Sequence, residues 1–323
     1  MNRKLYVAAF ASLTLAACAS AAVTALPYQG PSHDWQPQAA STRAIGLGLV
    51  GSVLGEGVTF AGGVQLLTPT VSPLRSLSDL KLVGDTGFVT VSDAGDLIRG
   101  ELLLDEAGKL VGLSQFRSRR LTLTDGSPIT SKIDGDAEGL AILPNGDLLV
   151  SFERDHRIWN YGPLEALQNP RNLPRPIWPF NENGGMEAIA AVTDTLWYVA
   201  GEDGGVWNCD PAQCAIVVPA PAELLKDSDY RITGMDRDPH TDGFWVVQRS
   251  FSPPIDARAR VRHMAADGTL GPVMVELKLP GTTDNFEGIA ARQMGDNTRL
   301  YILSDDNENP LQRTLMLAFD VKR

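Results

Sequence analysis

The sequence predicts an all-β protein folded as a β-propeller, and a recurring hairpin pattern is the main observation behind this prediction. The pattern is clearest in residues 136–153, where two apolar runs flank Pro144-Asn145-Gly146-Asp147. An Asn-Gly turn between alternating apolar residues is a strong signal for a β-hairpin. Short apolar runs separated by glycine and proline continue through the 323 residues, while helical periodicity is scarce. Strands linked by regular turns give this pattern.

The hairpin occurs five times with the same layout. A polar residue opens the first apolar run and another closes the second run, fifteen positions later in four hairpins and eighteen in the fifth. These position pairs are Ser78 and Asp93, Glu138 and Glu153, Glu187 and Glu202, Thr233 and Gln248, and Glu287 and Asp305. Successive hairpins begin about fifty residues apart, which is typical of propeller blades.

The module count predicts five blades within a propeller domain at 43–323. The modules cover residues 76–124, 134–180, 185–225, 231–280 and 285–323. A sixth, degenerate blade within 43–76 is the alternative. The apolar run from Gly57 to Leu67 precedes the first module, and we expect it to complete the last blade. An N-terminal strand used in this way removes the free edges of a closed propeller.

The N-terminus is expected to direct export. Arg3 and Lys4 precede a short apolar stretch, which is too short to span a bilayer and has the form of a secretory signal peptide at 1–17. It ends in Leu15-Ala16-Ala17-Cys18, which resembles a bacterial lipobox, so Cys18 is the predicted lipidation site. Cleavage at a nearby Ala-rich site and an unused cysteine are the alternatives. Residues 18–42 then form a lipidated tether, and the expected location is the periplasmic face of the outer membrane.

The remaining cysteines and the net charge limit the function further. Cys209 and Cys214 flank a Pro turn, and such a pair in an exported protein predicts a disulfide. Two reduced thiols are the alternative. The formal net charge of −11 argues against a nucleic-acid partner, because phosphate-binding surfaces are basic.

The ten hairpin positions are expected to meet at one mouth of the central channel, because both ends of an antiparallel hairpin lie together. Seven of them are carboxylates, namely Asp93, Glu138, Glu153, Glu187, Glu202, Glu287 and Asp305. A cluster of oxygen ligands without thiolate or imidazole suits Ca²⁺, and Mg²⁺ less well. Glu138, Glu187 and Glu287 are the catalytic candidates. The alternative is that these carboxylates cap backbone N–H groups and tie neighbouring blades together.

Other catalytic signatures are mostly absent. The sequence has no Gly-x-Ser-x-Gly elbow, no His-Glu-x-x-His and no phosphate-binding Gly-Lys loop. His156 follows a mouth position and is a candidate general base, or else an exposed loop histidine. Arg154, Arg249 and Arg292 are candidates to clamp an anion, with pairing to the neighbouring acids as the alternative.

The chain resembles the bacterial family called "esterase-like activity of phytase". The resemblance covers roughly 45–323. It rests on the segments 136–141, 185–190 and 285–290, on Ser304-Asp305-Asp306-Asn307 and on Gln312-Arg313-Thr314. It implies a secreted propeller and a hydrolase of phosphoesters or other esters. Propeller phytases that depend on calcium hold several Ca²⁺ ions in an acidic mouth, which implies the same cation here. Ser78, Thr233 and Gln248 depart from a full ring of acids.

Two functions therefore follow from the sequence. The first is a metal-assisted hydrolase whose site lies at the acidic mouth. The second is a lipid-anchored propeller without catalysis that binds a ligand or an envelope protein on the same rim. Sugar-lactone chemistry is a third option.

Overall fold

A computed structural model describes residues 30, 32–182, 184–252 and 256–323 of the chain. The predicted signal peptide, Cys18 and the first part of the tether lie outside the described residues. The described part is almost entirely β-structure, with a single four-residue helix, α1 (Lys132–Gly135). Within it, we find no helix with the length and apolar character needed to cross a membrane.

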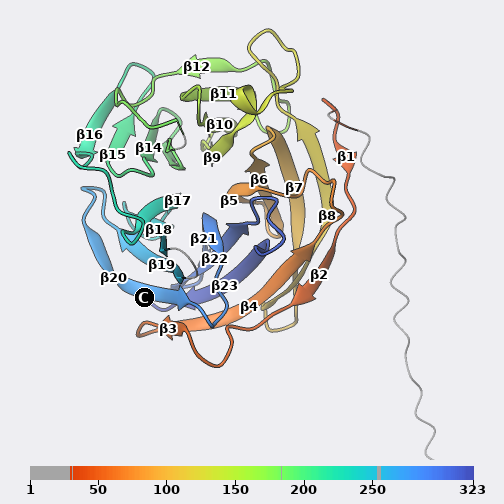
Figure 1. Cartoon of the computed structure of the whole chain (residues 1–323), viewed down its shortest axis with the longest axis vertical. Helices are drawn as coiled ribbons and strands as arrows, with labels where there is room; N and C mark the ends of the chain where they lie inside the picture. Colours follow the sequence, from red (N-terminus) through yellow and green to blue (C-terminus); the bar gives the residue numbers. More distant parts are fainter. Residues whose placement is uncertain (1–29, 31, 183, 253–255) are drawn as a thin grey trace, which may run out of the picture.

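The strands form antiparallel groups arranged around a central axis (Figure 1), so the predicted all-β propeller is confirmed. The first group contains β5 (Leu77–Val83), β6 (Gly87–Ser92), β7 (Asp96–Leu104) and β8 (Leu110–Arg120). The second contains β9 (Ala137–Ile142), β10 (Asp147–Phe152), β11 (Arg157–Pro163) and β12 (Arg171–Leu173). The third contains β13 (Ala188–Thr193), β14 (Leu196–Ala200), β15 (Val206–Cys209) and β16 (Cys214–Val218).

Two more groups complete the circle. One contains β17 (Arg231–Arg237), β18 (Phe244–Ser252), β19 (Asp256–Met264) and β20 (Leu270–Lys278), with β3 (Ser52–Leu54) on its outer edge. The other contains β21 (Asn285–Met294), β22 (Asn297–Asp305), β23 (Leu315–Val321), β4 (Val58–Leu67) and β2 (Ser41–Ala44). The short β1 (Gln36–Pro37) pairs with β8. The first strand of a group lies nearest the axis, as β5, β9, β17 and β21 show in Figure 1.

The N-terminal strand closes the propeller as predicted. β4 pairs antiparallel with β23, with Gly63 opposite Leu317. A parallel bridge between Gly62 and Leu110 then joins β4 to β8, which merges the first and last groups into one ten-stranded sheet. Because this bridge joins two groups, the number of blades stays a prediction. Gly62 has a positive φ of +107°, and a Cβ there would lie 2.2 Å from the carbonyl oxygen of Leu110.

The hydrophobic core lies between neighbouring groups of strands, which makes the ring cohesive. Val91 and Leu140 belong to one buried cluster that joins the first and second groups. Tyr301 and Leu80 belong to another, which joins the last group to the first. Each large side chain buried in this way contributes about 1.5–3 kcal/mol through the hydrophobic effect.

Polar side chains add further ties between the groups. The carboxylate of Asp79 on β5 accepts a hydrogen bond from the backbone N–H of Leu140 on β9 at 2.9 Å. Ser151 on β10 donates to the carbonyl of Met186 at 2.7 Å. The predicted disulfide is also confirmed, since Cys209 and Cys214 are bonded across the turn between β15 and β16.

Candidate functional site

The candidate site is the channel mouth at which the inner strands begin. The first three hairpins share one backbone hydrogen bond. The acid at the end of the second strand donates its N–H to the carbonyl of the residue two positions before the polar residue that begins the first strand. These bonds join Asp93 to Ser76, Glu153 to Asp136, and Glu202 to Gly185, at 3.2, 2.9 and 3.0 Å. In the last hairpin Asp305 lies opposite Asn285, which is also two positions before Glu287. The repeat in the sequence is therefore a repeat in geometry.

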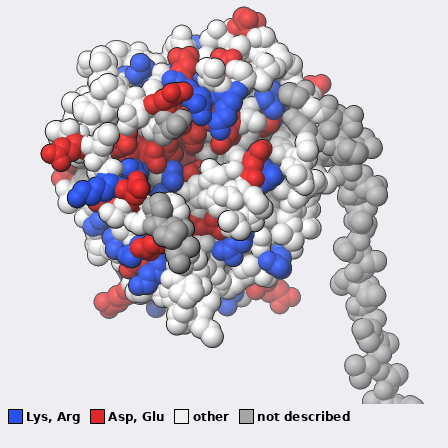
Figure 2. Space-filling view, in the orientation of Figure 1, with Lys and Arg blue, Asp and Glu red and all other residues white. Residues whose placement is uncertain are grey.

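Acidic side chains gather around the central hollow of this face (Figure 2). Within the described residues, two sets of three acidic side chains can each bring one oxygen atom to within 4.8 Å of one another. One set is Asp93, Asp136 and Glu138, and the other is Glu153, Glu187 and Glu202. Glu287 and Asp305 lie close enough to interact electrostatically with members of these sets. All seven predicted carboxylates are thus brought together at one mouth.

Burial of these acids favours their protonated forms. Glu138, Glu187 and Glu287 are only 8%, 3% and 5% exposed. Burial raises the pKa of Glu138 well above its ordinary value, and the charges of Asp93 and Glu153 raise it further. Burial and the neighbouring Glu138 do the same to the pKa of Glu187. A carboxylate loses its hydration when it is buried. Protonation, a nearby cation or hydrogen bonds can compensate for the lost hydration energy.

Two of the acids have pKa values near neutrality. Burial raises the pKa of Glu153 to about 7, although hydrogen bonds with Glu187 and the backbone N–H of Gly185 oppose the shift. Burial likewise raises the pKa of Glu287 to about 7, opposed by the charge of Arg249. The pKa of Asp305 is raised well above its ordinary value by burial and by the charge of Glu287. Burial therefore favours the protonated forms of these acids up to near neutral pH.

Three cationic side chains neutralise part of the cluster. Lys132 lies 3.2 Å from both Asp93 and Asp136, and Arg154 pairs with Asp136. Arg249 lies 3.0 Å from Glu202 and 3.4 Å from Glu287. Against these three cations stand eight carboxyl groups, the seven predicted ones and Asp136, so five are left in excess. In the described structure, the carboxyl groups of Glu138, Glu153, Glu187 and Asp305 form no ion pair.

Polar side chains orient Glu287. Ser78 donates a hydrogen bond to its Oε2 at 3.2 Å, and Asn285 donates to its Oε1 at 2.8 Å. With Arg249 on the same oxygen, the carboxylate has a fixed position. Ser78, in the first group of strands, therefore orients a carboxylate of the last group and contributes no carboxylate of its own to the mouth. Thr233 has a structural role, because its hydroxyl donates to the backbone carbonyl of Phe286 at 2.8 Å.

Comparison with protein families now identifies the chain. A model of the family "Esterase-like activity of phytase" matches residues 72–308. The chain belongs to this phytase-like family. The matched segment contains all seven predicted carboxylates and Asp136. No curated protein matches the chain in sequence.

Several solved structures are similar at low identity. A structural genomics protein of unknown function from Bacteroides thetaiotaomicron is 11% identical with a TM-score of 0.46, over 91% of this chain and 84% of that one. A putative gluconolactonase is 11% identical with a TM-score of 0.44, over 88% and 93%. The PQQ-bound aldose sugar dehydrogenase of Streptomyces coelicolor is 13% identical with a TM-score of 0.37, over 90% and 100%.

In this phytase-like chain, sequence reasoning missed two residues of the mouth. Asp136 is only 2% exposed and ends the short helix α1, whose N-cap is Ser131. Lys132 lies on the first turn of that helix and reaches Asp136 across four positions. The one sequence pattern that could have indicated this pair is the spacing of four between Lys132 and Asp136, which places two side chains together on a helix. A four-residue helix is too short for hydrophobic periodicity to reveal it.

The other candidates from the sequence have different outcomes. Arg249 and Arg154 pair with neighbouring acids. Arg292 does not reach the mouth, because its guanidinium binds the backbone carbonyls of Gly84 and Asp85 in the turn at the far end of β5. His156 lies near Glu153 but its Nε2 contacts the carbonyl of Asn181 at 2.9 Å, and its ring packs against Phe180.

The donor set fits a hard cation. The two acidic sets at the mouth offer carboxylate oxygen ligands, and four carboxyl groups of the mouth are buried and form no ion pair with any described residue. Ca²⁺ binds six to eight such oxygens in flexible geometry, whereas Mg²⁺ requires a stricter octahedron. The residues that would hold the ion are Glu153, Glu187 and Glu202, with Glu138 beside them.

Proposed function

We propose that this phytase-like propeller is a metal-assisted hydrolase of phosphoesters or other esters, with its site at the acidic mouth. The observation that supports this most is the excess of buried carboxyl groups over cations. Such an excess costs stability, and a bound cation would offset part of that cost. A bound Ca²⁺ would polarise an ester or phosphoryl oxygen and help orient the substrate.

The chain's own residues have separate roles in this proposal. Glu187, Glu153 and Glu202 bind the cation. Glu287 is the general base that takes a proton from the water attacking the ester carbon or phosphorus, because a pKa of about 7 suits proton abstraction near neutral pH. Ser78 and Asn285 hold its carboxylate in place. Glu138, whose pKa burial raises well above its ordinary value, donates a proton to the leaving group.

Arg249 is the residue that contacts the anionic oxygen of the substrate in this proposal. Its guanidinium lies between Glu202 and Glu287, and its Nε atom is buried without a hydrogen-bond partner. A guanidinium binds phosphate or carboxylate oxygens well. We infer that the substrate's anionic oxygen lies against this group.

A second function rests on the ion pairs themselves. Lys132, Arg154 and Arg249 already neutralise part of the mouth, as in a structural network. A propeller that binds a ligand or an envelope protein on this rim without catalysis would show the same pairs. Turnover separates the two functions.

The test combines calorimetry with activity assays. Ca²⁺ is titrated into the wild type and into Glu153→Gln/Glu187→Gln, which lacks two of the three proposed ligands, with Glu106→Gln/Glu165→Gln as a matched double variant of exposed acids. We expect micromolar binding that only the first double variant weakens. A panel of phosphoesters and carboxylic esters should then be hydrolysed with calcium and not with chelator. Absence of calcium binding in the wild type would contradict the mechanism, and binding without turnover would favour the second function.

Export and lipid anchoring are part of the same proposal. The lipobox-like segment at Cys18 supports them, and a disulfide is stable in an oxidising compartment. Expression in a Gram-negative host with labelled palmitate tests the anchor. Wild type should be labelled and fractionate with the outer membrane, whereas Cys18→Ser should be unlabelled and lost from that fraction. Equal labelling of both proteins would contradict the assignment.

A further inference from the structure

A pocket of about 240 Å³ lies at the perimeter, away from the acidic mouth. It is formed between the outer strand β8 with the loop that follows it, the third strand β11 of the next group, and the segment around His33. Its lining residues include Arg119, Leu121, Tyr161, Leu167 and Asn169. The volume is below the range of about 300–1,000 Å³ for drug-sized ligands, so it suits a small molecule or ion.

One cation that lines the pocket, Arg119, has no ion-pair partner among the residues that the structure describes. The side chain of Arg119 is half-buried, and it forms no hydrogen bond or ion pair with any described residue. Its Nε atom is fully buried. Burial lowers its pKa, and the nearby Arg99 lowers it further, while only Asp34 opposes the shift. A half-buried guanidinium that forms no ion pair is costly, and a bound anion would reduce that cost.

The other basic residues nearby are already paired, which isolates Arg119 further. Arg120 also lines the pocket but pairs with Asp96 at 2.9 Å. Arg99 pairs with Glu165 at 2.8 Å and lies over the ring of Trp35. The guanidinium carbon of Arg119 also lies over this ring, 5.9 Å from its centroid. Trp35 thus holds Arg119 in position without neutralising it.

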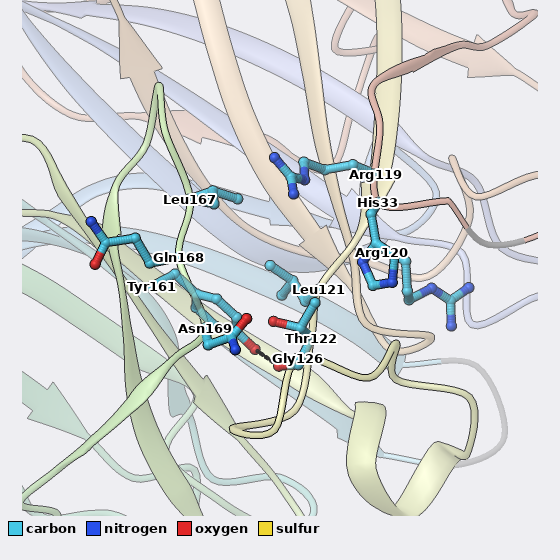
Figure 3. Close-up of a pocket in the computed structure, with 10 residues that line it drawn as sticks. All are labelled: His33, Arg119, Arg120, Leu121, Thr122, Gly126, Tyr161, Leu167, Gln168 and Asn169. Atoms are coloured by element: carbon cyan, nitrogen blue, oxygen red, sulfur yellow. Dashed lines mark hydrogen bonds between the residues drawn. The ribbon is translucent and has the colours of Figure 1, made fainter.

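The remaining walls suit a small organic anion. Figure 3 shows Arg119 on one side of the pocket with its guanidinium toward Leu167, Asn169 on the other side, and Leu121 between Arg119 and Asn169. The hydroxyl of Tyr161 donates to the carbonyl of Thr122 at 2.9 Å, which fixes the floor. The amide of Asn169 can donate to an anionic oxygen, and the two leucines can contact a short carbon chain.

We propose that this pocket binds the carboxylate or phosphate group of a small molecule through Arg119. The site is separate from the acidic mouth and its cation. The ligand is bound bidentately by the guanidinium, since Arg presents a planar fork that matches such groups. Asp34 is the competing charge on this face.

The test is an anion titration of the full chain in chelator, so that no cation at the mouth contributes. Inorganic phosphate and acetate are titrated at constant ionic strength, with calorimetry and with the Nε–H signals of ¹⁵N-labelled arginine as readouts. We expect millimolar or tighter binding that shifts one arginine signal. Arg119→Gln should lose that signal and weaken binding at least about tenfold, while Arg117→Gln, an exposed neighbour on the same strand, should bind like wild type.

Further variants separate this site from a general charge effect. Asp34→Asn should strengthen anion binding about two- to fivefold, because it removes the competing charge. Arg119→Lys keeps the positive charge but lacks the planar guanidinium, so it tests whether bidentate binding matters. Circular dichroism checks that each variant is folded. Equal binding by wild type and a folded Arg119→Gln protein, or no binding of either anion up to about 50 mM, would overturn the proposal. Because chelator is present throughout, this outcome is independent of the fate of the hydrolase proposal.

Discussion

Arg249 within β18 and Glu287 near the start of β21 belong to two neighbouring groups of strands, and their Nη2 and Oε1 atoms lie 3.4 Å apart. The same guanidinium nitrogen lies 3.0 Å from Glu202, which follows β14 in a third group. Burial lowers the pKa of Arg249, but Glu287 and Glu202 outweigh this effect and raise it. One guanidinium therefore connects three groups of strands at the mouth.

Removing this guanidinium should destabilise the protein. Without calcium, Arg249→Met should lower the free energy of unfolding by about 2–3 kcal/mol at pH 7.5, because it leaves two more acids without a cation. Calcium should restore part of the loss. Urea denaturation with chelator and with calcium measures both effects. The control is Arg258→Met, because the side chains of Arg258 and its partner Asp256 are both about half exposed, and its effect should stay below about 1 kcal/mol. Equal effects of both variants would contradict the role of Arg249.

Stability in chelator should fall as the pH rises from about 4.5 to above 7. The pKa values of Glu153 and Glu287 are raised by burial to about 7, so the folded state binds more protons than the unfolded chain in this window. Linkage then makes the unfolding free energy decrease with pH, by at least about 2 kcal/mol between pH 5 and 8. Urea titrations at both pH values measure the difference.

Calcium and a double variant provide the controls for the pH effect. Calcium replaces the protons at the mouth, so saturating calcium should reduce the loss at pH 8. Glu153→Gln/Glu287→Gln should also flatten the dependence in chelator. Stability in chelator that rises steadily from pH 5 to 8 would contradict the raised pKa values.

Asp79 should matter for folding and not for the mouth. It is fully buried, accepts hydrogen bonds from the backbone N–H groups of Leu80 and Leu140, and lies 2.6 Å from Lys81. Asp79→Ala should cost about 3–5 kcal/mol, because it leaves Lys81 buried and unpaired. Thermal unfolding measures the loss, with the exposed Asp85→Ala as control. If the variant folds, its calcium affinity should equal that of wild type, and a specific loss of affinity would assign Asp79 to the site.

The closure of the ring should depend on Gly62. Gly62→Ala places a methyl group against the carbonyl of Leu110 and forces a positive φ on alanine, so we expect a loss of about 2 kcal/mol or more. Hydrogen exchange should show faster opening of β4 and β8. Gly46→Ala is the matched control, because nothing lies within 4 Å of a Cβ at that position. Equal unfolding midpoints for the two variants would mean that the bridge contributes little.

The sequence determined the hairpins and the mouth on which they converge. Glu138 and Glu153 could be placed together because antiparallel pairing between adjacent strands depends on local turn chemistry and a period of two. The pairing of β4 with β23 was also predictable, because a closed propeller needs an N-terminal strand to cover the free edge of its last blade. The disulfide followed from two cysteines around one turn.

Only the tertiary structure decided which charges meet at the mouth. Arg249 reaches Glu202 and Glu287 from other groups of strands, and Lys132 reaches Asp93 over 39 positions. The turn that contains Lys132 is too short to predict. The unpaired Arg119 also emerges only when β8, β11 and the segment around His33 are packed together. Strand pairing depends on segments that are neighbours in sequence. The ionisation of a buried group depends instead on the charges near it and on the residues that exclude water from it, and these come from distant parts of the chain.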